Sequence, residues 1–158
     1  ILPHSKIFIP YRNPIQHAYS LLSQHKRFIE DPKKDKFTSN YMRWIGHTEF
    51  GRNYIPIHDK NLNFKNDLDI NHWLEQWYLT YHNCLVSLKD RDNVYFICYE
   101  QLCASKEYWL DILKISDIKE TYDFEFKESQ KDIPLEIENG IGNKVSPLYS
   151  ELSNIALR

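Results

Sequence analysis

The sequence of 158 residues has few glycines and few cysteines, and it contains no long apolar run. Only four glycines stand against four tryptophans, eleven tyrosines and eight phenylalanines, so we expect an aromatic-rich, helix-dominated core with few flexible joints. No stretch approaches the roughly 20 apolar residues that span a bilayer, and no signal-peptide pattern opens the chain. We therefore expect no membrane span in this region and a cytoplasmic location.

The few cysteines and the spacing of the histidines argue against a disulfide-rich protein and against a metal-binding protein. Cys84, Cys98 and Cys103 are an odd number, and two of them fall in or near an apolar strand pattern, so a disulfide framework is not expected. The seven histidines are scattered without an HxxxH or CxxC pattern. The sequence therefore predicts no metal site.

Positive and negative charges in the sequence nearly balance. Lys and Arg number 20 and Asp and Glu number 22, which gives a formal net charge of -2. This balance excludes the broad basic surface typical of nucleic-acid binders, so any anion site must be local and no nucleic-acid partner is expected. The length fits one domain over residues 1–158. Because the chain opens on Ile1 and reaches its first apolar run within six residues, we expect that domain to be truncated at its N-terminus.

Hydrophobic periodicity predicts two strand-to-helix units joined by a long helix. Such units imply an α/β fold with a parallel sheet flanked by helices. The aromatic stripe Trp73, Trp77 and Tyr81 has the period of a buried helix face and is expected in the core. The predicted elements are strands over 7–11 and 94–99, helices over 14–30, 38–49, 70–88, 105–115 and 147–157, a charged loop over 31–36, an irregular excursion over 53–69, and an edge strand or extended arm over 117–132.

The turn after the first strand predicts an anion site. Arg12 follows the strand directly, and Ser20 lies in the helix that begins after Asn13 and Pro14. Ligands of parallel sheets bind beyond the carboxyl ends of strands, where the following helix presents unpaired N–H groups. Arg12 and Ser20 could together grip one phosphate. The alternative is that Arg12 is a surface residue and that Ser20 bonds to its own preceding turn.

A family pattern favours the phosphate site. The segment KIFIPYRNPIQHAYSLL resembles the strand, Arg-x-Pro turn and serine-bearing helix by which sulfotransferases hold the 3′-phosphate of 3′-phosphoadenosine 5′-phosphosulfate (PAPS). The segment VYFICYEQLCASKEYWLDILKISDI is similar to the family's later strand, Tyr-Glu-x-Leu turn and helix. The segments YMRWIGHTEFG and INHWLEQWYLTYHNCL are similar to a bacterial-type branch. The resemblance covers most of residues 6–116 and implies a partial, helix-rich, P-loop-NTPase-like sulfotransferase fold.

The resemblance implies roles for individual residues. Arg12 and Ser20 would bind the 3′-phosphate, and Tyr99 would lie near the adenine, with a core role at the strand end as the alternative for Tyr99. Glu100, in the same turn, is expected to hold loops together. The family's second phosphate loop, rich in Gly and Lys, has a loose counterpart in residues 140–144, for which a plain connection before a helix is the alternative.

The resemblance also implies parts that the sequence does not contain. The family's lysine-containing phosphosulfate loop would lie upstream of Lys6, and its catalytic base would fall before or within the first few residues. His4 is near that place but matches no motif, so the catalytic residue is unknown. We expect a sulfotransferase that moves a sulfuryl group from its co-substrate PAPS to a hydroxyl or amine acceptor without a metal. This chain would supply the 3′-phosphate-binding half and turn over little alone.

One histidine is a candidate for the acceptor side. His47 lies between two glycines in GHTEFG and could border the acceptor pocket; the irregular stretch after Glu49 and Phe50 would then be a lid, with a structural loop as the alternative. The other histidines of the helices have no nucleophile or carboxylate partner at meaningful spacing, so solvated or packed roles are expected. They are His17, His25, His72 and His82.

Two other classes of function stay open. A P-loop small-molecule kinase has a similar sheet, and it would require a Walker loop upstream with a Ser or Thr for Mg²⁺. A non-catalytic interaction domain could keep the sulfotransferase fold and lack the phosphosulfate loop. The identity of the acceptor and the oligomeric state are not readable from the sequence.

Overall fold

The protein is described here as a computed structural model that covers residues 5–60, 62–119, 125–128 and 131–157, without the side chains of residues 31–34 and 38–39. Within these ranges, no helix combines the length and the apolar character that crossing a bilayer requires. In chain order the elements are β1 (Ile7–Tyr11), α1 (Pro14–Lys34), α2 (Lys36–Trp44), the 3₁₀ turn η1 (Gly51–Asn53), α3 (Ile70–Leu88), β2 (Val94–Cys98), α4 (Tyr99–Ala104), α5 (Lys106–Ile115) and α6 (Asn139–Ile155).

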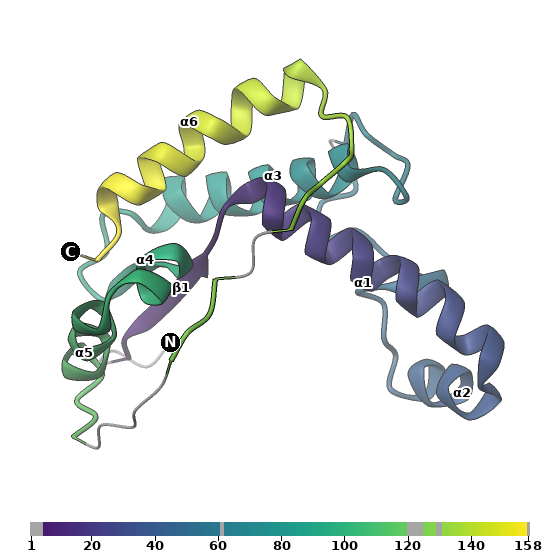
Figure 1. Ribbon diagram of the computed structural model, residues 1–158, viewed down its shortest axis with the longest axis horizontal. Coiled ribbons are helices and arrows are strands. Elements are labelled where there is room, and N and C mark those ends of the chain that lie inside the picture. The colour runs from purple at the N-terminus through teal and green to yellow at the C-terminus, as the bar shows by residue number, and fades with distance from the viewer. Residues whose placement is uncertain (1–4, 61, 120–124, 129–130, 158) are drawn as a thin grey trace.

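A parallel pair of strands lies between two layers of helices, so the predicted α/β fold with a parallel sheet is confirmed at this level (Figure 1). Successive side chains of a strand point to opposite faces. On one face Tyr11 and Phe96 belong to the main core with α3 and α6. On the other face Phe8 and Ile97 pack with Tyr108 of α5 in a smaller cluster. Both faces are therefore covered, which explains the continuous apolar runs of the two strands.

The main core lies where α1, α3 and α6 meet the sheet. Helix α3 is the centre of this core, because each of its residues from Ile70 to Trp77 is buried. Helix α6 runs alongside α3 in Figure 1 and packs its own apolar stripe against it. The stripe consists of Ile141, Val145, Leu148 and Leu152. The expected core position of the aromatic residues of α3 is confirmed, since Trp73, Trp77 and Tyr81 are all buried.

The predicted boundaries of the first two helices were wrong. The stretch predicted as a charged loop, 31–36, is helical up to residue 34, and Asp35 alone separates α1 from α2. Asp35 Oδ1 accepts a hydrogen bond from the N–H of Phe37 at 2.9 Å, as a residue that caps a helix start does. Helix α2 ends at Trp44 rather than at residue 49 because Gly46 adopts φ +64° and the N–H of His47 bonds back to Met42 O.

Later boundaries also differ from the prediction. Tyr99 begins the short helix α4 instead of ending β2. Helix α6 begins at Asn139, eight residues before the predicted start, and it contains Pro147. Of the stretch 117–132, the residues that the structure describes belong to no strand, which leaves the extended arm of the two alternatives. Tyr122 and Phe124 of that stretch lie outside the described residues.

Candidate functional site

The two family-like motifs meet at one edge of the sheet. Tyr11 of β1 is the register partner of Cys98 of β2, so the next residues, Arg12 and Tyr99, emerge side by side at the carboxyl ends of parallel strands. The Arg12 guanidinium carbon lies over the Tyr99 ring, 5.3 Å from its centroid. Cation and ring attract each other at this distance. Residues 87 positions apart are thus brought together at the edge where open sheets bind ligands.

The N-terminus of α1 does not present the free amides expected there. Asn13 Oδ1 accepts hydrogen bonds from the N–H groups of Ile15 and Gln16, both at 3.1 Å. The N–H of His17 bonds to Asn13 O at 2.9 Å. Asn13 is therefore the cap of this helix, and Pro14 takes the first helical position, which needs no donor. An anion beside Arg12 would gain these amides only if the Asn13 side chain moved away.

Ser20 bonds within its own helix. Its hydroxyl donates to Gln16 O at 2.9 Å, which is the arrangement named above as the alternative to a phosphate contact. Ser20 is half-buried in the second turn of α1. To donate to a phosphate, the hydroxyl would have to rotate away from Gln16.

Glu100 links the elements around Arg12 through hydrogen bonds. Its Oε1 accepts the N–H of Asn13 at 2.8 Å, and its Oε2 accepts the Tyr149 hydroxyl of α6 at 3.2 Å. This one carboxylate therefore joins the turn after β1, the turn after β2 and the last helix. These contacts agree with the expected role of Glu100 in holding loops.

An extended segment between α5 and α6 crosses the same edge and brings lysines that the sequence analysis missed (Figure 1). The Tyr99 hydroxyl donates to Lys127 O at 3.0 Å. The main chain of Lys131 pairs with the Gln16 side chain through two hydrogen bonds, of 2.9 and 3.0 Å. The Lys131 ammonium lies 5.6 Å from the centroid of the Tyr19 ring. Only the alternation of lysine with acidic residues marked this stretch, and that pattern is typical of any solvated segment.

Residues 140–144 form neither a phosphate loop nor a plain connection. They lie in the first turns of α6, where Ile141 is buried against the core. The Lys144 ammonium lies over the Tyr78 ring of α3, 5.8 Å from its centroid. Burial of the apolar stripe of α6 against α3 outweighs the low helix propensity of Gly140 and Gly142. The sequence-based interpretation of this segment was therefore wrong.

His17 separates the Arg12 edge from a cavity. Burial and the positive charge of Arg12, partly opposed by Glu100, together lower the pKa of His17 to about 4. The imidazole is therefore neutral at physiological pH. It was expected to be solvated or packed, and it is half-buried, with its ring 6.4 Å from that of Tyr81. The Tyr81 hydroxyl donates to Pro10 O at 2.7 Å, which ties α3 to β1 beside this histidine.

The cavity next to His17 has a volume of about 590 Å³ and mostly apolar walls. Its walls come from α1, from the segment 48–57 and from one side of α3. Glu49 is the only charged residue among them, unless His17 is protonated. The lining residues are His17, Leu21, Thr48, Glu49, Phe50, Tyr54, Ile55, Ile57, Trp73, Gln76, Trp77, Thr80 and Tyr81.

His47 lies at a different cavity. Its ring stacks on Phe28 with centroids 5.0 Å apart and planes 8° apart, and its Nε2 is 3.5 Å from a Glu49 carboxylate oxygen. The cavity that it lines has about 220 Å³ and also borders Met42 and Arg43 of α2. Of the residues in this segment, Glu49 lines the large cavity, His47 lines the small one and Phe50 lines both.

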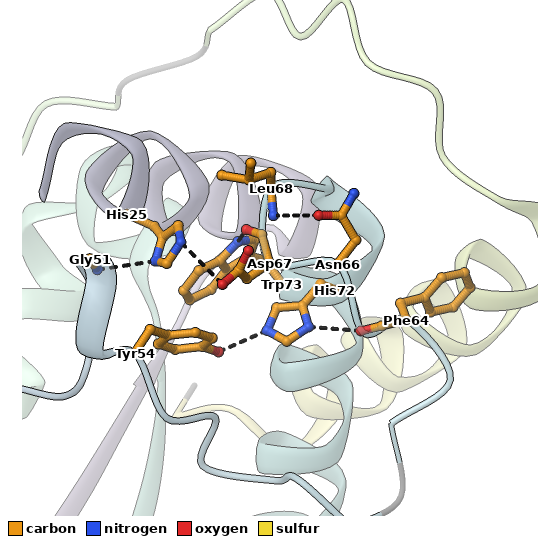
Figure 2. A network of polar contacts seen from close by, with 9 residues as sticks. All are labelled: His25, Gly51, Tyr54, Phe64, Asn66, Asp67, Leu68, His72 and Trp73. Atoms are coloured by element: carbon orange, nitrogen blue, oxygen red, sulfur yellow. Dashed lines mark hydrogen bonds and ion pairs between the residues drawn. The ribbon is translucent and has the colours of Figure 1, made fainter. Parts of the chain in front are cut away.

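Two buried histidines, His25 of α1 and His72 of α3, bind the irregular segment around residues 53–69 through hydrogen bonds and an ion pair (Figure 2). His25 Nδ1 accepts the N–H of Gly51 at 3.2 Å, so its proton is on Nε2, which lies 3.5 Å from an Asp67 carboxylate oxygen. His72 Nδ1 lies 2.7 Å from Phe64 O and donates to it, while Nε2 accepts the Tyr54 hydroxyl at 2.8 Å. Of the solvated and packed roles expected for these histidines, the contacts show the packed one.

A buried carboxylate fixes the same excursion further along. Glu75 of α3 accepts the N–H groups of Asn63 and Phe64 at 2.8 and 2.9 Å. Gln76 exchanges hydrogen bonds of 3.2 and 2.9 Å with the main chain of His58. A segment held by this many buried polar groups is a structural loop rather than a lid.

Over the part of the chain that the structure describes, no three His, Cys, Asp or Glu side chains are grouped so that they could hold a metal ion. Comparison with protein-family models, with curated proteins and with solved structures found no match for this chain.

Proposed function

We propose that this chain is the 3′-phosphate-binding half of a PAPS-dependent sulfotransferase with a P-loop-like sulfotransferase fold. The observation that carries the proposal is the meeting of Arg12 and Tyr99 at the carboxyl edge of two parallel strands. The resemblance assigns one of these residues to the phosphate and the other to the adenine. A fold that placed Arg12 and Tyr99 at opposite ends of the sheet would have argued against the proposal.

The chemistry of the edge is suited to a nucleotide phosphate. Arg12 offers a planar fork that can bind a phosphate with two parallel hydrogen bonds. The aromatic face of Tyr99 lies against the guanidinium and limits its orientations. The Lys131 ammonium adds positive charge beside Tyr19 of α1, whereas the Lys127 ammonium is 3.9 Å from a Glu125 carboxylate oxygen. In this proposal the Ser20 hydroxyl rotates from Gln16 O to the phosphate when the nucleotide binds.

The acceptor would bind in the cavity of about 590 Å³ on the other side of His17. Its apolar, largely aromatic walls favour an uncharged acceptor with an apolar body. A neutral imidazole can accept a hydrogen bond from an acceptor hydroxyl, but a pKa of about 4 makes His17 a weak base at neutral pH. His17 would therefore orient the acceptor, and the residue that removes its proton is not assigned.

PAPS supplies the sulfuryl group, whose transfer requires mainly positioning and stabilisation of charge. Arg12 would hold the far end of the nucleotide, and Glu100 would keep the two turns of the site in register. This part of the site provides affinity and orientation rather than the chemical step.

Calorimetric titration with adenosine 3′,5′-bisphosphate tests the proposal. We expect binding that Arg12→Ala weakens by about tenfold to a hundredfold, because a charge-assisted hydrogen bond contributes about 1.5–3 kcal/mol. The matched control is Arg91→Ala, in the exposed turn after α3, which should bind as the unchanged chain does.

Two other ligands separate the competing functions. 5′-AMP lacks the 3′-phosphate and should bind more weakly than the bisphosphate, by a margin that Arg12→Ala removes. Binding of ATP with Mg²⁺ in preference to the bisphosphate would instead support a small-molecule kinase. A folded chain that binds none of these nucleotides would contradict the proposal for this chain and favour the interaction domain.

A further inference from the structure

Helix α2 exposes an apolar face that packs against no other element described. Phe37, Tyr41 and Trp44 are spaced so that they share one side of the helix, and Ile45 directly follows its last residue; their exposed fractions are 67%, 49%, 69% and 55%. The rings of Phe37 and Tyr41 stack with centroids 6.1 Å apart. An apolar stripe on a surface helix normally faces the core, so one that faces outward marks a contact surface.

The position of α2 makes this face accessible. In Figure 1, α1 and α2 form an arm, and α2 lies at the end of it that is remote from the sheet, α5 and α6. Met42 and Arg43 line the small cavity with Phe28, so this side of α2 faces the body. The aromatic stripe is therefore the outer side of the arm.

The net charge around α2 indicates which kind of partner its outer face contacts. Residues 26–45 contain six of the 20 basic residues and three of the 22 acidic ones, a local net charge of +3 in a chain whose net charge is -2. Lys36 and Arg43 are exposed on α2 itself. Aromatic side chains on one face with Lys and Arg beside them are typical of helices that lie in a membrane interface. Tyrosine and tryptophan are also enriched at that depth.

We propose that the outer face of α2 binds the surface of an anionic lipid bilayer. Phe37, Tyr41 and Trp44 would lie at the boundary between headgroups and acyl chains, and Lys36 would face lipid phosphates. A second copy of this chain fits the face less well, because two such contacts would bring together two tips of net charge +3. The inference is independent of the proposed sulfotransferase activity.

Vesicle flotation tests this inference. We expect the chain to float with vesicles of mixed phosphatidylcholine and phosphatidylserine and to stay largely unbound with phosphatidylcholine alone. The double substitution Phe37→Ser with Trp44→Ser should weaken partitioning by tenfold or more, because burying each side chain contributes about 1.5–3 kcal/mol. Val86→Ser is the matched control, since Val86 is 63% exposed on α3 and lies outside the arm. Circular dichroism checks that the variants are folded.

A second pair of substitutions tests the electrostatic part. Lys36→Gln should weaken binding about fivefold, whereas Lys89→Gln, at the end of α3, should leave it unchanged. No flotation of the folded chain with either vesicle would overturn the proposal. Binding that the aromatic substitutions leave unchanged would overturn it too, as would a stable dimer that the same substitutions dissociate.

Discussion

Arg12, Asn13 and Glu100 are neighbours in space because one carboxylate accepts the N–H of the residue that follows the arginine. Asn13 uses its side chain to cap α1 and its main chain to reach Glu100. The residues around the proposed anion site thus form hydrogen bonds with one another. At this scale the candidate site is a set of polar groups that have partners within the chain, and ligand binding would exchange some of these partners.

His17 predicts how stability depends on pH. Its pKa is about 4 in the folded chain and near 6.5 when unfolded, so between these values the unfolded state binds a proton that the folded state does not. The free energy of unfolding should therefore fall as the pH drops from 6.5 to about 4 and stay constant with respect to this group above 7. His25, whose pKa burial also lowers, contributes with the same sign.

Urea unfolding at pH 7 and pH 5 measures this effect. His17→Gln should reduce the loss of stability between the two pH values, by on the order of 1 kcal/mol. His82→Gln is the control, because His82 is exposed and its ring stacks only on Tyr78 in the contacts described. An unchanged pH dependence for His17→Gln would mean that the imidazole is accessible to protons in the folded chain.

At the scale of elements, α6 shows how packing overrides local propensity. Two glycines near its start and Pro147 in its interior all disfavour a helix. Four buried apolar residues on one side, packed against α3, favour it, and each contributes about 1.5–3 kcal/mol. Asn71 of α3 also fixes the start of the helix, because its side chain accepts the N–H of Glu138 at 2.9 Å.

Pro147→Ala should stabilise the protein. Proline inside a helix removes one hydrogen bond and crowds the preceding turn, and Pro147 is exposed, so alanine costs no packing. We expect the free energy of unfolding to rise by about 1–2 kcal/mol, after allowance for the greater entropy of the unfolded chain. Urea denaturation measures it. Pro134→Ala, in the irregular segment before α6, should give no gain; equal effects from both would argue against a continuous α6.

At the scale of the whole molecule, burial is distributed unevenly. Helix α3 is enclosed by α1, α6 and the excursion, and eight consecutive residues from Ile70 to Trp77 are buried. Helix α2 has no buried residue among its described side chains. The protein thus has a dense centre beside the sheet and an arm that depends on few contacts.

Hydrogen exchange should reproduce this distribution. Amides in the first half of α3 should exchange slowest, close to the limit set by global unfolding, because they open only when the core does. Amides of α2 should exchange fastest among the helices, since local opening of the arm exposes little additional apolar surface. Mass spectrometry of peptides from α2 and α3 measures the ratio of their exchange rates. Equal protection of both would show that the arm unfolds only with the core.

The long elements could be predicted from the sequence because their signals are local. Helix α3 has both of its predicted ends, since a continuous apolar stripe and the cap at Asp69 act within a few residues of each other. Arg12 could be chosen as a candidate because it follows an apolar strand, and Tyr99 because it lies in the Tyr-Glu-x-Leu turn of the family pattern. Local patterns failed for α6 and for the segment 31–36, where glycine, proline and charge disfavour a helix.

The sequence by itself determined the two parallel strands, the central helix and the residue types at the carboxyl edge, because these depend on periodicity and on turn chemistry. Only the tertiary structure decided that Arg12 lies over Tyr99, that Lys131 crosses the start of α1, and that His17 is half-buried beside an apolar cavity. It also decided that residues 140–144 are helical. These features depend on which elements pack together, and contacts between residues far apart in the chain leave no periodic signal in it.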